Sequence, residues 1–259
     1  MIDFVKRITK KAGQIALSSP KLIRGRKEGR GNWVTQADLE SERFLIQSIK
    51  TNFPLHNILS EETLMEKQDF KALDNLWILD PIDGTTNFTF ALPLFSVSVA
   101  YLKKGIPIYG AVYDPSRDEL FYAEKSRGAK LNDKPIRVLS AVNFKGTIVD
   151  IGCPYMEKDF KKTYPLGEIF FDLGARITNL GSGALECAYV ACGRLALYYE
   201  NGLKPWDIAA AYLIVTQAGG KMDSVTKPFS LLNSDEIIAG NKTLVAKGKK
   251  LIKNFPVST

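Results

Sequence analysis

The chain contains a single histidine, His56, and only three cysteines, Cys153, Cys187 and Cys192. One imidazole argues against a zinc site built from several histidines and against a Ser-His-Asp triad. An odd number of cysteines without a CxxC spacing indicates reduced thiols rather than a framework of disulfides. Catalysis by this chain would therefore depend on carboxylates, hydroxyls, lysines or a bound metal ion.

Long apolar runs are also missing. No run reaches the roughly 20 residues that a membrane span needs. The N-terminal segment also lacks the apolar core of a signal peptide. We therefore expect a cytoplasmic protein that does not bind membranes.

The size and composition are typical of a globular protein. The 259 residues, 45% hydrophobic and 24% charged, suffice for one large layered domain or two small ones. The net charge of +7 favours anionic partners such as phosphate esters or nucleic acid. A lysine-rich solvated surface is the simpler explanation of the same charge.

The order of elements predicts stacked α and β layers with a boundary near residue 136. Apolar residues at helical spacing predict helices over residues 2–17 and 35–53. Short apolar runs predict strands over 57–60, 76–80, 95–105, 106–115 and 118–125, then a hairpin over 130–138 with Asn132 and Asp133 at its turn. In the second half, strands are expected at 146–152, 194–201 and 235–241, and helices at 184–193, 205–220 and 242–255. Residues 23–33, rich in glycine and charge, predict a loop.

One segment, WILDPIDGTTNF, places two acids at the end of a buried strand. Asp80 follows the apolar run, Pro81 interrupts regular pairing, and Gly84 permits an unusual φ or a close backbone approach. The Thr-Thr-Asn that follows Gly84 can begin a helix whose free N–H groups face an anion. Because Asp80 and Asp83 would repel a phosphate, this pattern favours divalent cations lying between the acids and the phosphate.

Two other interpretations of this segment are possible. It could be an acidic turn capped by an aspartate, although its strand-proline-glycine context is unusually specific. It could also belong to a phosphatase in which an aspartate becomes phosphorylated. The signature of that class is Asp-x-Asp-Gly-Thr, whereas the two aspartates here are three residues apart. The extra residue changes where the second carboxylate points, so this interpretation is poor.

Further acids fit a cation site. NILSEET places Glu61 and Glu62 after another short apolar run, and adjacent like charges are costly unless they are solvated or metal-bound. KPWDIAAA places Asp207 at the start of the most apolar helix, where an acid also serves as a partner of the helix dipole. Each acid alone has an ordinary structural explanation. Together the strand-end and helix-start acids favour one shared cation site.

These motifs resemble the inositol monophosphatase family of Mg²⁺-dependent, lithium-sensitive phosphatases. The resemblance rests on VTQAD, LSEE, WILDPIDGTTNF, ITNLGSGALECAYVACGRLALYYENG and GLKPWDIAAAYLIVTQAGG, in this order along nearly the whole chain. It implies an α-β-α-β-α layered sandwich of the sugar phosphatase type. The expected halves are residues 1–136, with an antiparallel sheet and the metal-binding motifs, and residues 137–259, with a mixed sheet that completes the active site.

The resemblance also implies a role for individual residues. One Mg²⁺ would be held by Glu61, Asp80 and the carbonyl of Ile82. A second would be held by Asp80, Asp83 and Asp207, and Glu61 could share a third. Thr85, paired with Asp38, would activate the attacking water, and Glu62 would orient water or support the ligands. The amides of Gly84 and Thr85 would bind phosphate. Substrate hydroxyls would contact Asp83, Gly181, Ser182, Gly183, Glu200 and Asp207.

The implied activity is hydrolysis of inositol monophosphate or a similar small sugar phosphate. Fructose-1,6-bisphosphatase and histidinol-phosphatase activities on the same site are alternatives within this superfamily. A homodimer is the expected assembly. A role in binding RNA or the transcription machinery is a weaker alternative, because a binding protein has no need to keep Glu61, Asp80, Asp83 and Asp207 together.

Overall fold

The computed structural model describes residues 1–27, 29, 33–63 and 73–255. Two helices, α1 (Ile2–Ser18) and α2 (Gln36–Asn52), form the first layer, close to the predicted ranges. α1 buries its apolar stripe, including Val5 and Ile8, against the neighbouring sheet. α2 begins at Thr35, whose side chain forms a reciprocal capping box with Asp38. This cap fixes Asp38 at the end of the helix that faces the candidate site.

The second layer is a seven-stranded sheet with the order β3-β4-β5-β6-β7-β8-β9. Its strands are β3 (Asn57–Ser60), β4 (Asn75–Asp83), β5 (Ser96–Lys103), β6 (Ile106–Asp114), β7 (Glu119–Glu124), β8 (Ala129–Leu131) and β9 (Lys134–Pro135). β3 and β4 are parallel and all other neighbours are antiparallel. The predicted turn at Asn132 and Asp133 is confirmed, since both residues have a positive φ between β8 and β9.

Two apolar helices, α6 (Gly183–Ala191) and α7 (Pro205–Gln217), form the central layer. α7 contacts β5 and β6 on one side and β13 (Lys221–Asp223) on the other, and α6 contacts β12 (Leu197–Asn201) and β14 (Glu236–Gly240). These helices are apolar on almost every side because both of their faces are covered by sheets.

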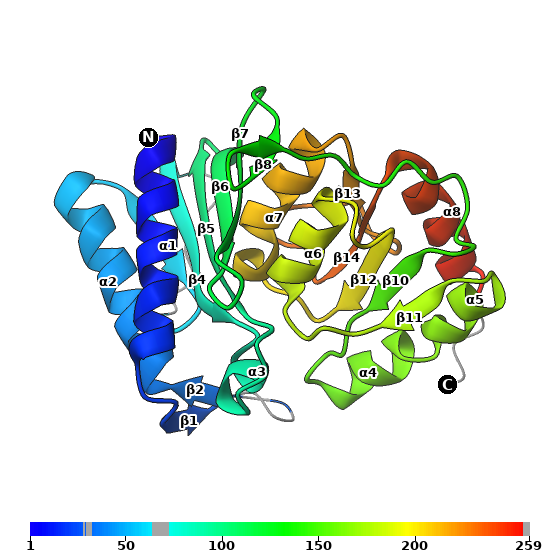
Figure 1. Cartoon of the computed structure of the whole chain (residues 1–259), viewed down its shortest axis with the longest axis horizontal. Coiled ribbons are helices and arrows are strands. Elements are labelled where there is room, and N and C mark those ends of the chain that lie inside the picture. The colour runs from blue at the N-terminus through cyan, green and yellow to red at the C-terminus, as the bar shows by residue number, and fades with distance from the viewer. Residues whose placement is uncertain (28, 30–32, 64–72, 256–259) are drawn as a thin grey trace.

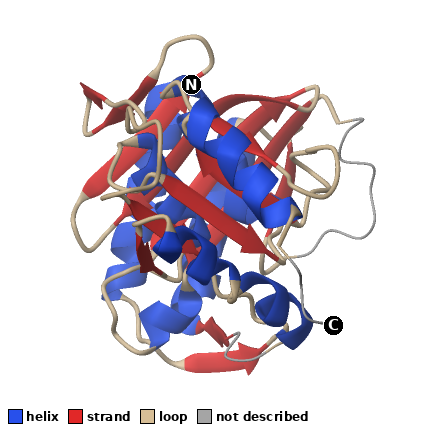
Figure 2. Cartoon of the chain, turned by 90° about the vertical axis from the view of Figure 1, so that its right-hand side faces the viewer, coloured by secondary structure: helices blue, strands red, loops and turns tan. Residues whose placement is uncertain are grey.

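The fourth layer is a five-stranded sheet with the order β11-β10-β12-β14-β13. β10 (Ile148–Ile151) is parallel to β11 (Arg176–Thr178) and to β12, whereas β14 is antiparallel to β12 and β13. The sheet is therefore mixed. Helices α4 (Glu157–Thr163), α5 (Leu166–Asp172) and α8 (Lys242–Lys253) form the fifth layer. Figure 1 shows the five layers side by side, and Figure 2 looks onto the outer helices.

The predicted α-β-α-β-α sandwich is confirmed, with one parallel pair, β3–β4, in the otherwise antiparallel first sheet. The division at residues 136 and 137 stays a prediction. Among the helices of the described residues, none is long and apolar enough to cross a membrane.

The predicted loop at residues 23–33 was wrong at both ends. β1 (Ile23–Arg26) and β2 (Trp33–Thr35) form a small antiparallel sheet, and residues 28 and 30–32 between them lie outside the described part of the chain. Short polar strands with glycine carry no clear alternation, which is why periodicity missed them. The elements α4, α5, β11 and β13 were also absent from the prediction, because each is too short to show a clear period.

Candidate metal and phosphate site

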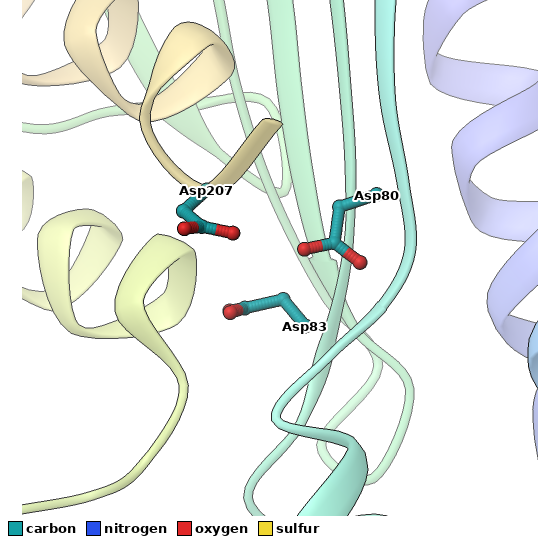
Figure 3. A group of neighbouring side chains, drawn as sticks. All are labelled: Asp80, Asp83 and Asp207. Atoms are coloured by element: carbon teal, nitrogen blue, oxygen red, sulfur yellow. The ribbon is translucent and has the colours of Figure 1, made fainter. Parts of the chain in front are cut away.

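Three aspartates converge where the first sheet meets the central helices. Asp80 and Asp83 lie at the end of β4, and Asp207 lies in the first turn of α7. One carboxylate oxygen from each lies within 4.8 Å of the others, and Figure 3 shows the three side chains reaching into one space. The strand irregularity between Asp80 and Asp83 makes this possible, because regular pairing skips Pro81 and Ile82.

Positive charge would relieve the electrostatic repulsion among the three aspartates. Burial, and then the charges of Glu61, Asp83 and Asp207, raise the pKa of Asp80 well above its usual value. Burial, and then the charges of Glu61 and Asp83, raise the pKa of Asp207. Buried carboxylates this close destabilise one another unless a proton or a cation lies among them. A donor set made only of carboxylate oxygens fits a hard divalent cation such as Mg²⁺.

Glu61 and Glu62 follow β3 and are held by a lysine. The Lys27 Nζ lies 2.7 Å from Glu61 Oε1 and 2.7 Å from Glu62 Oε1. Burial opposes the charged form of Lys27, but attraction by both glutamates outweighs it and raises the lysine pKa. Burial, and then the charge of Glu61, raise the pKa of Glu62 to about 7. Of the two glutamates, Glu61 lines the cavity that holds the aspartates. The ion pair with Lys27 was not predicted.

Gly84 turns the chain from β4 into the short helix α3 (Thr85–Thr89). Its φ is +88°, and a Cβ here would lie 3.0 Å from the carbonyl oxygen of Gly181, so glycine is required on both counts. The turn brings the Thr85 hydroxyl within 2.9 Å of the Ile82 carbonyl and 3.3 Å of Asp38 Oδ1. Burial raises the pKa of Asp38 to about 6.

The Gly181–Gly183 turn leads into α6 and reaches across to Asp83. The Ser182 hydroxyl donates to Asp83 Oδ2, and so does the backbone N–H of Ala184, at 2.9 Å. Ser182 is buried, whereas Gly181 and Gly183 line the cavity. Ser182, one of the predicted substrate contacts, thus already donates its hydroxyl hydrogen bond to a carboxylate of the protein.

Two buried acids behind this turn were missed. The Oε1 of Glu186 accepts hydrogen bonds from the backbone N–H groups of Leu180, at 2.7 Å, and Gly181, at 2.8 Å. Glu186 Oε2 and both oxygens of Asp150 are buried and have no donor among the described residues. Burial is the main cause of a raised pKa at both residues, about 7 at Glu186. The sequence did contain a signal for Glu186, because it is the one charged residue in the apolar helix segment ALECAYVA.

The site opens into a cavity of about 430 Å³. Its lining includes Glu61, Asp80, Asp83, Asp207 and the Gly84–Asn87 segment. The other lining residues include Cys153, Pro154, Tyr155, Glu157, Phe160, Asn179, Glu200 and Leu203. Glu200 lies near the end of β12 and accepts a hydrogen bond from the Tyr198 hydroxyl. The cavity is therefore large enough for a small organic phosphate rather than for a polymer.

The chain belongs to the inositol monophosphatase family, whose profile matches residues 1–255. It is 37% identical over 251 residues to the Nus factor SuhB of Escherichia coli K12, covering 95% of this chain and 92% of that protein. It is 33% identical over 229 residues to the inositol-1-monophosphatase of Mesorhizobium japonicum, covering 87% and 85% of the two chains.

Solved structures agree with this assignment. The extragenic suppressor protein suhB from Bartonella henselae superposes with a TM-score of 0.89 at 29% identity, over 98% of each chain. The IMPase of Thermotoga maritima superposes with a TM-score of 0.86 at 33% identity, over 97% of this chain and 96% of that one.

Proposed function

We propose that this protein is a Mg²⁺-dependent phosphomonoesterase that hydrolyses inositol monophosphate or a similar small phosphorylated polyol. The observation that carries the proposal is the convergence of Asp80, Asp83 and Asp207 within 4.8 Å at the base of a cavity. Phosphate monoesters are hydrolysed extremely slowly without help, and closely spaced oxygen ligands are the means by which proteins place cations on a phosphate. Membership of the inositol monophosphatase family supports the same activity.

The described residues offer one acidic cluster, Asp80, Asp83 and Asp207, and two or three ions would bind around it. One Mg²⁺ would be held by Glu61, Asp80 and the Ile82 carbonyl. A second would be held by Asp80, Asp83 and Asp207, and Glu61 could share a third. The Ile82 carbonyl accepts one hydrogen bond, from Thr85, and its second lone pair suits a further ligand. When bound, the ions lower the pKa of a water molecule and neutralise charge on the phosphate and the leaving oxygen.

Asp38 and Thr85 would position the attacking water and accept its proton. Their oxygens lie 3.3 Å apart, and the capping box with Thr35 holds Asp38 in place. A carboxylate with a pKa near 6 is a suitable general base close to neutral pH. Glu62, beside Lys27, would orient water or support Glu61.

The remaining contacts would hold the substrate. The amides of Gly84 and Thr85 would bind the phosphate, since they lie at the start of α3. The hydroxyls of the alcohol would contact Asp83, Asp207, Glu200 and the Gly181–Gly183 turn.

The test is phosphate release from inositol 1-phosphate with Mg²⁺, compared with fructose 1,6-bisphosphate and histidinol phosphate. We expect turnover that stops on chelation and falls at least about 100-fold in Asp83→Asn. Asp223→Asn is the matched control, because Asp223 pairs with Lys221 and Lys249 and none of the three lines the cavity. A wild type that is inert on every small phosphomonoester would overturn the proposal.

A second candidate role is binding to RNA or to the transcription machinery. The similarity to the Nus factor SuhB and the net charge of +7 favour it. In that case RNA binding should weaken steeply with salt and persist in Asp83→Asn.

We also expect a homodimer, which sedimentation can measure.

A further inference from the structure

A turn at residues 180–182 is held through its backbone from two helices. The Asn87 side chain on α3 donates to the carbonyl oxygens of Leu180, at 2.6 Å, and Gly181, at 3.3 Å. Glu186 on α6 accepts hydrogen bonds from the N–H groups of the same two residues through Oε1. Gly181 also lines the cavity, so the position of Glu186 affects where this turn can meet a substrate.

Glu186 has an acidic neighbour. Asp150 on β10 is fully buried, and its carboxyl lies within hydrogen-bonding reach of the Glu186 carboxyl. Glu186 Oε2 and both oxygens of Asp150 have no donor among the described residues. Two ionised carboxylates can only accept hydrogen bonds, and at this distance they would repel each other. A proton on one of the two acids turns this repulsion into a hydrogen bond.

The groups around this pair are acids, thiols and a phenol. Burial is the largest cause of the raised pKa of both acids, and the charge of Glu200 adds to it at Asp150 and that of Asp83 at Glu186. Glu186 acts in turn on the thiols and the phenol of Cys153, Cys187 and Tyr198. Among the described groups that chiefly shift the pKa of either acid, none is a lysine or an arginine. Buried acids in such surroundings favour a form in which a proton is retained.

We propose that Asp150 carries a proton and donates a hydrogen bond to Glu186 Oε2, and that this bond positions the turn at residues 180–182 for substrate binding. Asp150 is the donor, because two N–H groups stabilise the charged form of Glu186, whereas no described group donates to Asp150. With both oxygens engaged, the carboxylate of Glu186 is held against the turn. Neither acid is among the described residues that line the cavity, so both are positioning residues. The role in substrate binding rests on the proposed phosphatase function, whereas the hydrogen bond does not.

Infrared spectroscopy tests where the proton lies. The spectrum of Asp150→Asn is subtracted from that of the wild type at about pH 8, above the pKa of about 7 of Glu186. We expect the difference to contain the C=O stretch of a protonated carboxyl. Asp172→Asn, at an exposed position on α5, should remove an ionised carboxylate instead. The signal of an ionised carboxylate for Asp150 as well would overturn the proposal, because the pair would then be satisfied by a water molecule or a cation.

Hydrogen exchange tests whether the bond holds the turn. Asp150→Leu keeps the approximate shape of the side chain without a donor, whereas Asp150→Asn replaces the O–H donor with an N–H donor. We expect the amides of Leu180 and Gly181 to exchange at least about fivefold faster in Asp150→Leu and within about twofold of the wild type in Asp150→Asn. Asp172→Leu is the control for an equal change on the surface. Unchanged exchange in Asp150→Leu would overturn the positioning role.

Thermal unfolding checks that each variant folds. If Asp150→Leu does not fold, Asp150→Ala, which also lacks a donor, takes its place.

Kinetics test the consequence for the substrate. With inositol 1-phosphate and Mg²⁺, we expect KM to rise at least about fivefold in Asp150→Leu while kcat stays within about threefold, because the turn would hold the alcohol equally in the ground state and the transition state. Asp150→Asn should restore KM to near the wild-type value. An unchanged KM in Asp150→Leu would overturn the role in substrate binding.

Failure of the proposed function can be told apart from failure of this inference. If the wild type hydrolyses no ester, the infrared and exchange experiments still test the hydrogen bond and the turn, and calorimetry of inositol 1-phosphate with Mg²⁺ replaces KM. Equal affinity of the wild type and Asp150→Leu would then overturn the role in substrate binding.

Discussion

The hydroxyl of Ser182, just before α6, donates a hydrogen bond to the carboxylate of Asp83 at the end of β4. The two residues are 99 positions apart, and the contact joins the first sheet to the central helices. Ser96 and the backbone N–H of Ala184 donate to the same oxygen, at 3.1 Å and 2.9 Å. One oxygen of Asp83 is thus fixed by the protein, and the rotation of its carboxylate is set before any ligand binds.

Ser182→Ala should loosen this carboxylate. We expect Mg²⁺ binding to weaken about threefold to tenfold, because one of several hydrogen bonds to a charged group is lost, worth about 1 kcal/mol. Calorimetry with Mg²⁺ measures the change. Ser116→Ala, at an exposed position, is the control. Unchanged binding in Ser182→Ala would show that Ser96 and the backbone donors suffice to orient Asp83.

Gly84→Ala should damage both stability and activity. The left-handed φ strains an alanine, and its Cβ would lie 3.0 Å from the Gly181 carbonyl oxygen and 3.1 Å from that of Leu94. We expect a loss of about 1–3 kcal/mol in the free energy of unfolding, measured by denaturant titration. Gly25→Ala is the matched control, since its Cβ would meet nothing within 4 Å. Equal stability of the two variants would contradict this account.

The sequence was sufficient to predict the layers and to single out Asp80, Asp83 and Asp207, because long apolar elements and strand-end acids have strong local patterns. It could not predict that Ser182 binds Asp83, or that Lys27 bridges Glu61 and Glu62, since both contacts depend on how distant segments pack. Asp150 and Glu186 were missed for a related reason. Asp150 looks like an ordinary polar residue until the fold buries it, whereas Glu186 stood out only as the single charge in an apolar helix.

Lys27→Met should destabilise the protein when metal ions are chelated. Glu61 and Glu62 would lose the cation that lies 2.7 Å from each of them, while their side chains stay mostly buried. We expect a loss of about 1–3 kcal/mol in chelator, recovered in part by Mg²⁺, because unpaired buried charge is costly. Thermal unfolding with and without Mg²⁺ measures both effects.

Lys104→Met is the matched control for Lys27→Met. The ion pair of Lys104 with Asp74 is 4.0 Å long and both side chains are more than 70% exposed, so its loss should change the Tm little. If the two variants lose the same stability, Lys27 does not neutralise the glutamates as the geometry indicates.

Glu186 should make stability depend on pH. Its pKa rises from 4.5 in the unfolded chain to about 7 in the folded protein, chiefly through burial. A raised carboxyl pKa favours folding below the unfolded value, and this contribution is lost as pH rises from 4.5 through 7. Glu186→Gln does not titrate, keeps an acceptor for Leu180 and Gly181, and can donate to Asp150. We therefore expect Glu186→Gln to gain stability relative to the wild type between pH 5 and pH 8, by about 1–3 kcal/mol.

The measurement is the difference in the free energy of unfolding between variant and wild type at each pH. The difference reports Glu186 together with its effect on Asp150 and Glu200, because the charge of Glu186 also raises the pKa of both neighbours. Glu168→Gln, at an exposed position, should give a flat difference over the same range. Glu186→Leu should be less stable than Glu186→Gln at every pH, since it leaves the N–H groups of Leu180 and Gly181 without an acceptor. A flat difference for Glu186→Gln would contradict a raised pKa of Glu186 in the folded protein.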